Sequence, residues 1–272
     1  MKRLNSRTIA KIDLHAIRHN LSRVRSLCRT SKISAVVKAD AYGHGVSHVF
    51  ETIGDSVDAF AVATLDEAMH LRALGYEGHI WVFSGILLDE EITLFQQQKL
   101  TPVIHNERQL QWVQSTASDS PIILKVDSGM GRLGFKTSTV GTIIRSLKPR
   151  GSRLMLMGHF SHADQTSSEI TGQQLRLFLS IEKSEGCERS IAASGGILSG
   201  IGVNLSWVRP GLMLYGISPF VQCIGQEHEL IPAMTLESSL IAIRNFEKGD
   251  SIGYGGEWIC PDAMPVGFVG CG

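Results

Sequence analysis

Short apolar runs alternate with longer amphipathic stretches along the chain. Each run is apolar almost throughout, rather than at every second position, which is typical of strands covered on both faces in a parallel sheet. The runs lie at residues 33–37, 60–63, 80–83, 101–104, 122–126, 154–157 and 190–193, with a last strand in two short pieces at 207–208 and 212–215. The pattern therefore predicts eight parallel strands.

The stretches between these runs have the spacing of helices. Residues 65–74, 107–114 and 173–183 are clear examples. In the first of them, Leu65, Ala68 and Met69 have the three-and-four spacing of one helix face, and Gly75 supplies a stop signal. Eight strand–helix units predict an α/β fold, a closed (β/α)8 TIM barrel over residues 1–230. An open, doubly wound sheet is the structural alternative, and counting units does not separate the two.

The rest of the chain has a different character. Residues 231–272 are expected to begin a mainly β C-terminal domain, and an N-terminal strand at about residues 8–14 could pair with it. So short a segment forms too small a core to be stable alone. We therefore expect this domain to be truncated here and the chain to be part of a longer one.

Charge and composition exclude several classes of function. The chain has 26 lysines and arginines and 26 aspartates and glutamates, so it gives no electrostatic footprint for nucleic acid or an anionic membrane. It contains no run of about 18 apolar residues that would span a bilayer. The N-terminus lacks the apolar run of a secretory signal, and the 5 cysteines are scattered. We therefore expect a cytoplasmic protein with reduced thiols.

Chemistry is expected at the carboxyl ends of the strands, where TIM barrels carry their reactive residues. Lys38 directly follows the first apolar run and precedes Tyr42, Gly43 and Gly45. An amine at the mouth of a barrel can condense with an aldehyde. The alternative is a lysine that ends a strand only to reach solvent.

Two further strand ends carry candidate residues. Lys125 lies near the end of the fifth run, and Gly129 and Gly131 precede Arg132 in a loop that can present a guanidinium group to an oxyanion. An ordinary glycine-rich turn is the alternative. His159, with His162 and Asp164 nearby, follows the sixth run. This group suggests a metal site, but no further ligand cluster supports one, and we expect none.

The last two strands of a TIM barrel commonly build a phosphate site from exposed amides and a hydroxyl group. Ser194 stands before two glycines after the seventh run, and Arg209, Gly211 and Leu212 follow the start of the eighth. Beyond the barrel, Tyr254 lies among three glycines. It is either a surface ring on a tight turn or a catalytic group delivered from the second domain.

Together these segments resemble the alanine racemase family, a fold-type III group of pyridoxal-phosphate enzymes. The resemblance runs from about Thr8 to the end of the chain and rests on four motifs in the family's order. They are VVKADAYGHG around Lys38, KVDSGMGRLGF around Arg132, RPGLMLYG from Arg209 and GYGG at Tyr254. Four long motifs in one order make coincidence implausible.

The resemblance implies a role for each candidate residue. Lys38 would carry pyridoxal 5'-phosphate and, with Tyr254, form the pair of catalytic bases. Arg132 would bind the substrate carboxylate near the phenol oxygen of the cofactor, oriented by Lys125, which is often carbamylated in the family. The cofactor-binding residues would be Lys38, Tyr42, His159, Ser194, Arg209, Gly211 and Leu212, with Arg209 facing the pyridine nitrogen and His159 linking it to Tyr254.

The implied activity is the interconversion of L-alanine and D-alanine, which supplies D-alanine for peptidoglycan. Racemisation needs two bases because a proton leaves one face of the substrate and another arrives on the opposite face. In this family the tyrosine enters the active site of the partner subunit, so the resemblance implies a homodimer.

Three other interpretations remain open. A non-catalytic carrier of pyridoxal phosphate would share Lys38 and the phosphate loops but would have no use for Tyr254. A racemase of serine or of larger amino acids is not separated by the sequence, because part of the substrate pocket is expected in the missing region. A catalytically inactive remnant would bind the cofactor without forming the dimer.

Overall fold

The computed structural model describes residues 8–116, 120–147, 153–165, 169–181 and 187–271. The chain divides into two compact units. One unit extends from Asp13 to Ala233, and the other combines the residues up to Ile12 with those from Met234 onward. Each unit is described by itself.

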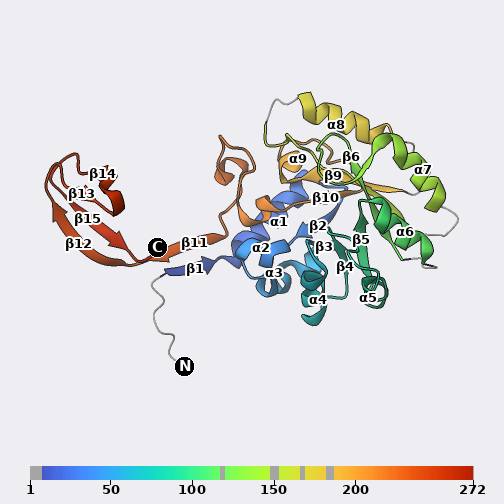
Figure 1. The fold of residues 1–272 in the computed structure, drawn as a ribbon, viewed down its shortest axis with the longest axis horizontal. Helices are drawn as coiled ribbons and strands as arrows, with labels where there is room; N and C mark the ends of the chain where they lie inside the picture. Colours follow the sequence, from blue (N-terminus) through green and yellow to red (C-terminus); the bar gives the residue numbers. More distant parts are fainter. Residues whose placement is uncertain (1–7, 117–119, 148–152, 166–168, 182–186, 272) are drawn as a thin grey trace. The chain divides into compact units, whose positions relative to one another are not determined.

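The larger unit is a closed barrel of eight parallel strands (Figure 1). Neighbours along the chain pair throughout, and the pairing of the last strand, β10, with the first, β2, closes the ring. The barrel prediction is confirmed, and the open sheet is excluded. The strands are β2 (Lys32–Val36), β3 (Ala59–Val62), β4 (His79–Val82), β5 (Leu100–Ile104), β6 (Ile122–Asp127), β8 (Leu154–Met157), β9 (Glu188–Ala193) and β10 (Trp207–Arg209).

Helices follow the strands and cover the outside of the barrel (Figure 1). They are α1 (Leu14–Leu27), α2 (Lys38–Gly43), α3 (Val46–Ile53), α4 (Leu65–Ala73), α5 (Glu91–Gln97), α6 (Glu107–Ser115), α7 (Thr137–Leu147), α8 (Glu169–Leu179) and α9 (Ser194–Leu198). The helices predicted at 65–74 and 107–114 are confirmed. The helix predicted at 173–183 begins earlier and ends at Leu179, and residues 182–183 lie outside the described part. No helix in the described ranges has both the length and the apolar character needed to cross a membrane.

One strand piece was predicted wrongly. Residues 212–215 form the 3-10 helix η3 (Leu212–Tyr215), not a strand. Pro210 has no N–H to continue the ladder after β10, and the amides of Gly211 and Met213 point to the side chain of Ser194 instead of a neighbouring strand. Gly216, with φ of 82°, then ends the turn in the left-handed region.

The core explains why the strands are apolar on both faces. Inside the barrel, Ala59, Ala61 and Trp81 pack together with Trp207, and the two indole rings lie 4.7 Å apart. Side chains on the outward faces, such as Leu124, pack under the helices. Because both faces are buried, apolar residues occupy successive positions of each strand.

The smaller unit is mainly β. β1 (Thr8–Ile12) pairs antiparallel with β11 (Met234–Ser238), β12 (Leu240–Phe246) with β15 (Met264–Val269), and β13 (Ser251–Ile252) with β14 (Trp258–Ile259). The smaller unit therefore combines the strand before the barrel, β1, with the strands that follow the barrel.

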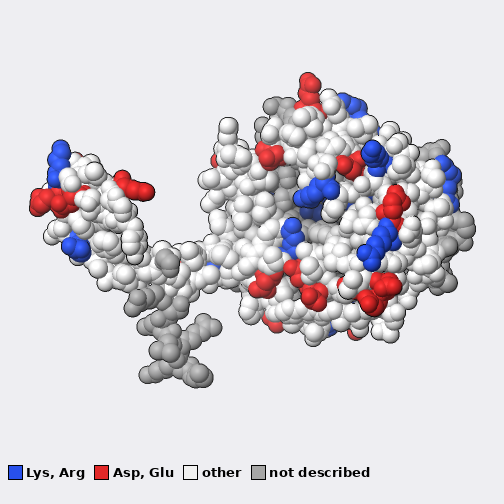
Figure 2. All heavy atoms as spheres, in the orientation of Figure 1, with Lys and Arg blue, Asp and Glu red and all other residues white. Residues whose placement is uncertain are grey.

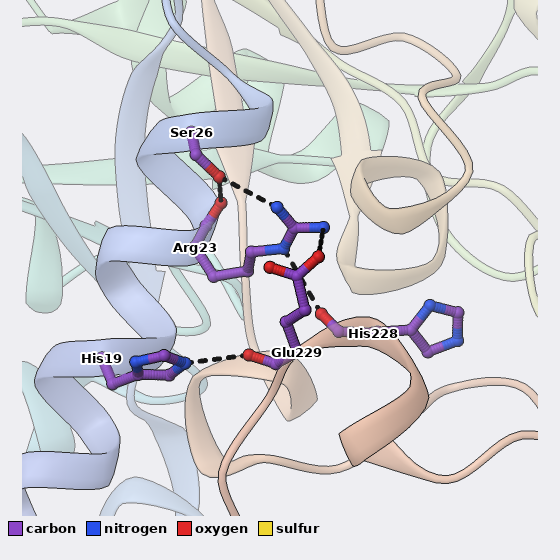
Figure 3. A network of polar contacts seen from close by, with 5 residues as sticks. All are labelled: His19, Arg23, Ser26, His228 and Glu229. Atoms are coloured by element: carbon purple, nitrogen blue, oxygen red, sulfur yellow. Dashed lines mark hydrogen bonds and ion pairs between the residues drawn. The ribbon is translucent and has the colours of Figure 1, made fainter.

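Helix α1 fixes the segment that follows η3. The buried Asn20 donates to the carbonyl oxygens of Leu214 and Ile231 at 3.0 and 2.8 Å and accepts from the N–H of Ile231 at 2.8 Å. Nearer the end of the helix, Arg23 forms an ion pair with Glu229 at 3.0 Å (Figure 3). These contacts hold the segment between η3 and the end of the barrel unit against helix α1.

Replacing Asn20 with Ala should lower the free energy of unfolding by about 2–4 kcal/mol, because it leaves buried backbone groups without partners. Urea denaturation measures the change. Ser22→Ala is the matched control on the exposed side of the same helix, with an expected change within about 0.5 kcal/mol. Equal effects of the two substitutions would contradict this account of the α1 contacts.

Candidate active site

A cavity of about 510 Å³ lies at the carboxyl ends of the barrel strands. Its lining includes four basic residues, Lys38, Lys125, Arg132 and Arg209, against a single carboxylate, Asp164, among the described residues. Figure 2 shows basic side chains gathered in a hollow on the barrel face, with acidic side chains around it. A partly enclosed cavity with this charge attracts anions.

Lys38 begins α2, which is a left-handed turn rather than a normal helix. Four successive residues other than glycine, Ala39 to Tyr42, have φ between 52° and 54°. For L-amino acids this conformation costs roughly 1–2 kcal/mol per residue. Strain of this kind persists only where surrounding contacts impose it, and it collects at functional sites.

Three polar side chains hold the strained turn. Asp40 Oδ1 accepts from the N–H of Val46 at 2.7 Å, and His44 Nδ1 lies 3.0 Å from the carbonyl oxygen of Ala41. Glu67 Oε1, from α4, accepts from the N–H of Ala39 at 2.7 Å. The half-buried Lys38 therefore projects into the cavity from a backbone fixed on several sides.

Tyr42, Ser194 and Gly211 form one wall of the cavity. Ser194 Oγ accepts from the amides of Gly211 and Met213 at 3.1 and 3.2 Å, so its own proton can be donated to a ligand. A Cβ atom on Gly211 would lie 2.9 Å from the Tyr42 hydroxyl and would push it aside, so glycine lets the hydroxyl keep this position. Burial raises the pKa of Tyr42 and keeps it a donor. The wall presents hydroxyl donors suited to a phosphate group.

Arg209 is buried at the end of β10, and its hydrogen-bond partners among the described residues are all neutral. It donates to Ser190 Oγ and to the carbonyl oxygens of Gly158 and Ile191, and it lies 3.3 Å from His159 Nδ1. Burial lowers the pKa of Arg209 to about 9, so the group remains a cation near neutral pH.

Burial and the charge of Arg209 affect the protonation of two neighbouring residues, His159 and Lys125. Burial, followed by the charge of Arg209, lowers the pKa of His159 well below its ordinary value. A neutral imidazole can accept from Arg209 at Nδ1 only when its proton is on Nε2. Burial and the charges of Arg209 and Arg132 likewise lower the pKa of Lys125 well below its ordinary value.

The loop that carries Arg132 is shaped by a single carboxylate. Asp127 Oδ1 accepts from the amides of Gly129, Met130 and Gly131 at 2.9, 2.8 and 3.1 Å. Gly129 and Gly131 have φ of 121° and 70°, in the region that favours glycine. The exposed Arg132 is therefore presented at the cavity by a preformed turn.

The structure brings the predicted barrel residues together around one cavity. Lys38, Tyr42, Lys125, Arg132, His159, Ser194, Arg209, Gly211 and Leu212 all line it. Tyr254 belongs to the smaller unit, where its side chain is fully exposed. Within the described ranges, no three histidine, cysteine, aspartate or glutamate residues are grouped to hold a metal ion.

Sequence reasoning missed other residues of the site. His105 lines the cavity at the end of β5, and the amide of Met213 bonds to Ser194 beside that of Gly211. Glu67 was also missed, although Thr64 and Glu67 have the spacing of a helix capping box. That spacing predicts a helix start but says nothing of a contact with the Lys38 turn.

The lowered pKa of His159 makes a prediction about stability without cofactor. The folded protein favours the neutral imidazole, whereas an unfolded histidine takes up a proton near pH 6.5. The contribution of this group to the free energy of unfolding is therefore fully present above about pH 6.5. It is lost as the pH falls below that value, because the unfolded chain then binds a proton that the folded protein does not. Urea midpoints measured between about pH 7.5 and 5.5 should fall less for His159→Gln than for the unchanged protein. The exposed His70→Gln is the control, and an identical fall for all three proteins would contradict the assignment.

Comparison with known proteins gives consistent results. Residues 12–219 match the family described as alanine racemase, N-terminal domain, and residues 233–272 match alanine racemase, C-terminal domain. An alanine racemase of Haemophilus influenzae is 41% identical over 97% of this chain and 74% of its own length. One from Nitrosococcus oceani is 42% identical over 97% of this chain and 75% of its own length.

Solved structures agree. An alanine racemase from Acinetobacter baumannii superposes with a TM-score of 0.92 at 34% identity, covering 97% of this chain and 75% of that one. A biosynthetic alanine racemase from Pseudomonas aeruginosa gives 0.91 at 37% identity, with the same coverage. A histidine racemase from Leuconostoc mesenteroides is similar at lower levels, 0.80 and 25%, covering 98% of this chain and 74% of its own.

Proposed function

The chain belongs to the alanine racemase family, and from this premise we propose how the residues of its cavity interconvert L-alanine and D-alanine. The observation that carries the proposal is the position of Lys38. Its amine stands on a strained turn at the mouth of a cavity whose other charged groups are mostly cations. A racemase needs such a lysine to hold the cofactor and to move a proton.

The cavity fits pyridoxal phosphate, which carries a phosphate, a phenol oxygen and an aldehyde. The Ser194 and Tyr42 hydroxyls would bind the phosphate beside Gly211 and Leu212, and Lys38 would react with the aldehyde. Arg132 would donate hydrogen bonds to the phenol oxygen of the cofactor and to the substrate carboxylate. When bound, the cofactor makes the α-proton of an amino acid easier to remove by withdrawing electrons.

Two bases on opposite faces of the substrate then exchange its α-proton. Lys38 Nζ would serve one face and Tyr254 Oη the other, so that one takes a proton while the other gives one. The fully exposed ring of Tyr254 is available to enter a site. We propose that the partner subunit's Tyr254 completes each cavity in a homodimer.

Arg209 and His159 would control protons at the far side of the cavity. Because Arg209 is a cation that only donates, it would disfavour a proton on a pyridine nitrogen held against it, and this would limit side reactions such as transamination. His159, held neutral with its proton on Nε2, can donate a hydrogen bond to the tyrosine oxygen. The two residues would thus connect the pyridine side of the cofactor to the second base, Tyr254.

Lys125 is suited to carbamylation. A neutral amine adds to carbon dioxide, forms an N–C bond and releases one proton, leaving an anionic carbamate. The lowered pKa of Lys125 favours the neutral amine, and the resulting anion would orient the nearby Arg132. A cytoplasmic location and a role in supplying peptidoglycan remain predictions from the sequence.

The test is the formation of D-alanine from L-alanine by this chain with added pyridoxal phosphate. Tyr254→Phe should lower turnover by roughly 10²- to 10⁴-fold, the contribution of one proton-transfer group, while borohydride still traps cofactor on Lys38. Tyr76→Phe, which removes a hydroxyl group outside the site, is the matched control and should keep its activity. Full turnover by Tyr254→Phe would sink the two-base proposal, and trapping without any turnover in the unchanged chain would favour a non-catalytic carrier.

A further inference from the structure

Glu67 connects two neighbouring loops at the mouth of the barrel. Its Oε1 accepts from the N–H of Ala39, in the turn after β2, at 2.7 Å. Its Oε2 accepts from the N–H of Ala63, directly after β3, also at 2.7 Å. Hydrogen bonds to an ionised carboxylate are roughly twice as strong as neutral ones. One side chain thus uses both oxygens to fix the turn that carries Lys38 to the adjacent strand end.

This arrangement differs from the use that the local sequence predicts. In a capping box, Thr64 would accept from the N–H of Glu67, and Glu67 would return a bond to the amide of Thr64 itself. The first bond is present at 3.4 Å. The carboxylate, however, serves the preceding amide of Ala63 and the distant amide of Ala39. Half of its hydrogen bonding therefore goes to a different segment of the chain.

The amide of Ala39 belongs to the peptide group that joins Lys38 to Ala39. Its orientation sets the backbone on the C-terminal side of Lys38 and so the direction in which the amine leaves the chain. Asp40 and His44 bond within the turn and to the start of α3. Glu67 instead ties the first left-handed residue, Ala39, to the barrel wall.

We propose that Glu67 is a positioning residue for Lys38, holding the amine in the direction required for attachment of the cofactor and for proton transfer. The proposal rests on the proposed function, in which Lys38 carries pyridoxal phosphate. Glu67 itself touches neither cofactor nor substrate. It acts by holding the strained turn against relaxation.

Two substitutions at this position separate charge from geometry. Glu67→Ala removes both hydrogen bonds, whereas Glu67→Gln keeps one acceptor and places an amide N–H₂ where the second acceptor was. Glu91 offers a matched control, because its Oε2 accepts from the amides of Leu87 and Leu88 at 2.8 and 3.4 Å in the loop after β4. Glu91→Ala loses the same kind of contact in a loop without the reactive lysine.

The experiment measures how fast pyridoxal phosphate attaches to Lys38 in cofactor-free protein, followed by absorbance and by the mass of the borohydride-trapped product. Glu67→Ala should slow attachment by about tenfold or more, within the roughly hundredfold cost of misplacing a reacting group by 1 Å. Glu67→Gln should lie between it and the unchanged protein. Thermal unfolding of each protein measures the loss of stability. In the Glu67 variants, kcat for racemisation should fall by a larger factor than KM changes.

Each outcome has one meaning. Slow attachment in the Glu67 variants, with normal attachment in Glu91→Ala at a similar loss of stability, supports the proposal. Normal attachment in Glu67→Ala overturns it and leaves Glu67 a helix cap only. Equal slowing in Glu91→Ala also overturns it, since the effect would then follow stability alone. If the unchanged protein fails to attach the cofactor at Lys38, the proposed function has failed instead.

Discussion

The site depends on one buried cation that has no negatively charged partner among the described residues. Arg209 lies inside the barrel mouth, and its partners in the described structure are a hydroxyl, two carbonyl oxygens and an imidazole, all neutral. Burying an unpaired charge is costly, so these hydrogen bonds must hold it closely. Burial, together with the charge of this cation, lowers the pKa of His159 and of Lys125 well below their ordinary values. The cation leaves a positive cavity that is best completed by an anionic ligand.

The second constraint is mechanical and concerns Lys38. A strand that ends in an ordinary turn would let a lysine reach solvent in many directions. Here four left-handed residues follow it at once, and contacts from α3, α4 and the turn itself hold them. A closed ring of strands supplies the rigid frame for both constraints, because each loop at the mouth starts from a strand buried on both faces.

The sequence predicts the barrel well because burial on both faces leaves a direct trace, a continuous apolar run for each strand. It fails at residues 212–215, where equally apolar residues form a 3-10 turn set by Pro210, Gly216 and the contact with Ser194. The barrel residues that line the cavity could be predicted because they stand at strand ends within recognisable motifs. The roles of Glu67 and of the Met213 amide could not, because they depend on contacts between segments far apart in sequence.

The most direct test of this account is the protonation of His159 by nitrogen NMR of histidine-labelled protein. If burial beside Arg209 governs His159, the imidazole is neutral at about pH 7 and carries its proton on Nε2, with Nδ1 accepting from the guanidinium group. Its signal should keep that form well below pH 6.5, the ordinary histidine range. A His159 that is protonated near pH 6.5, or that carries its proton on Nδ1, would contradict the account.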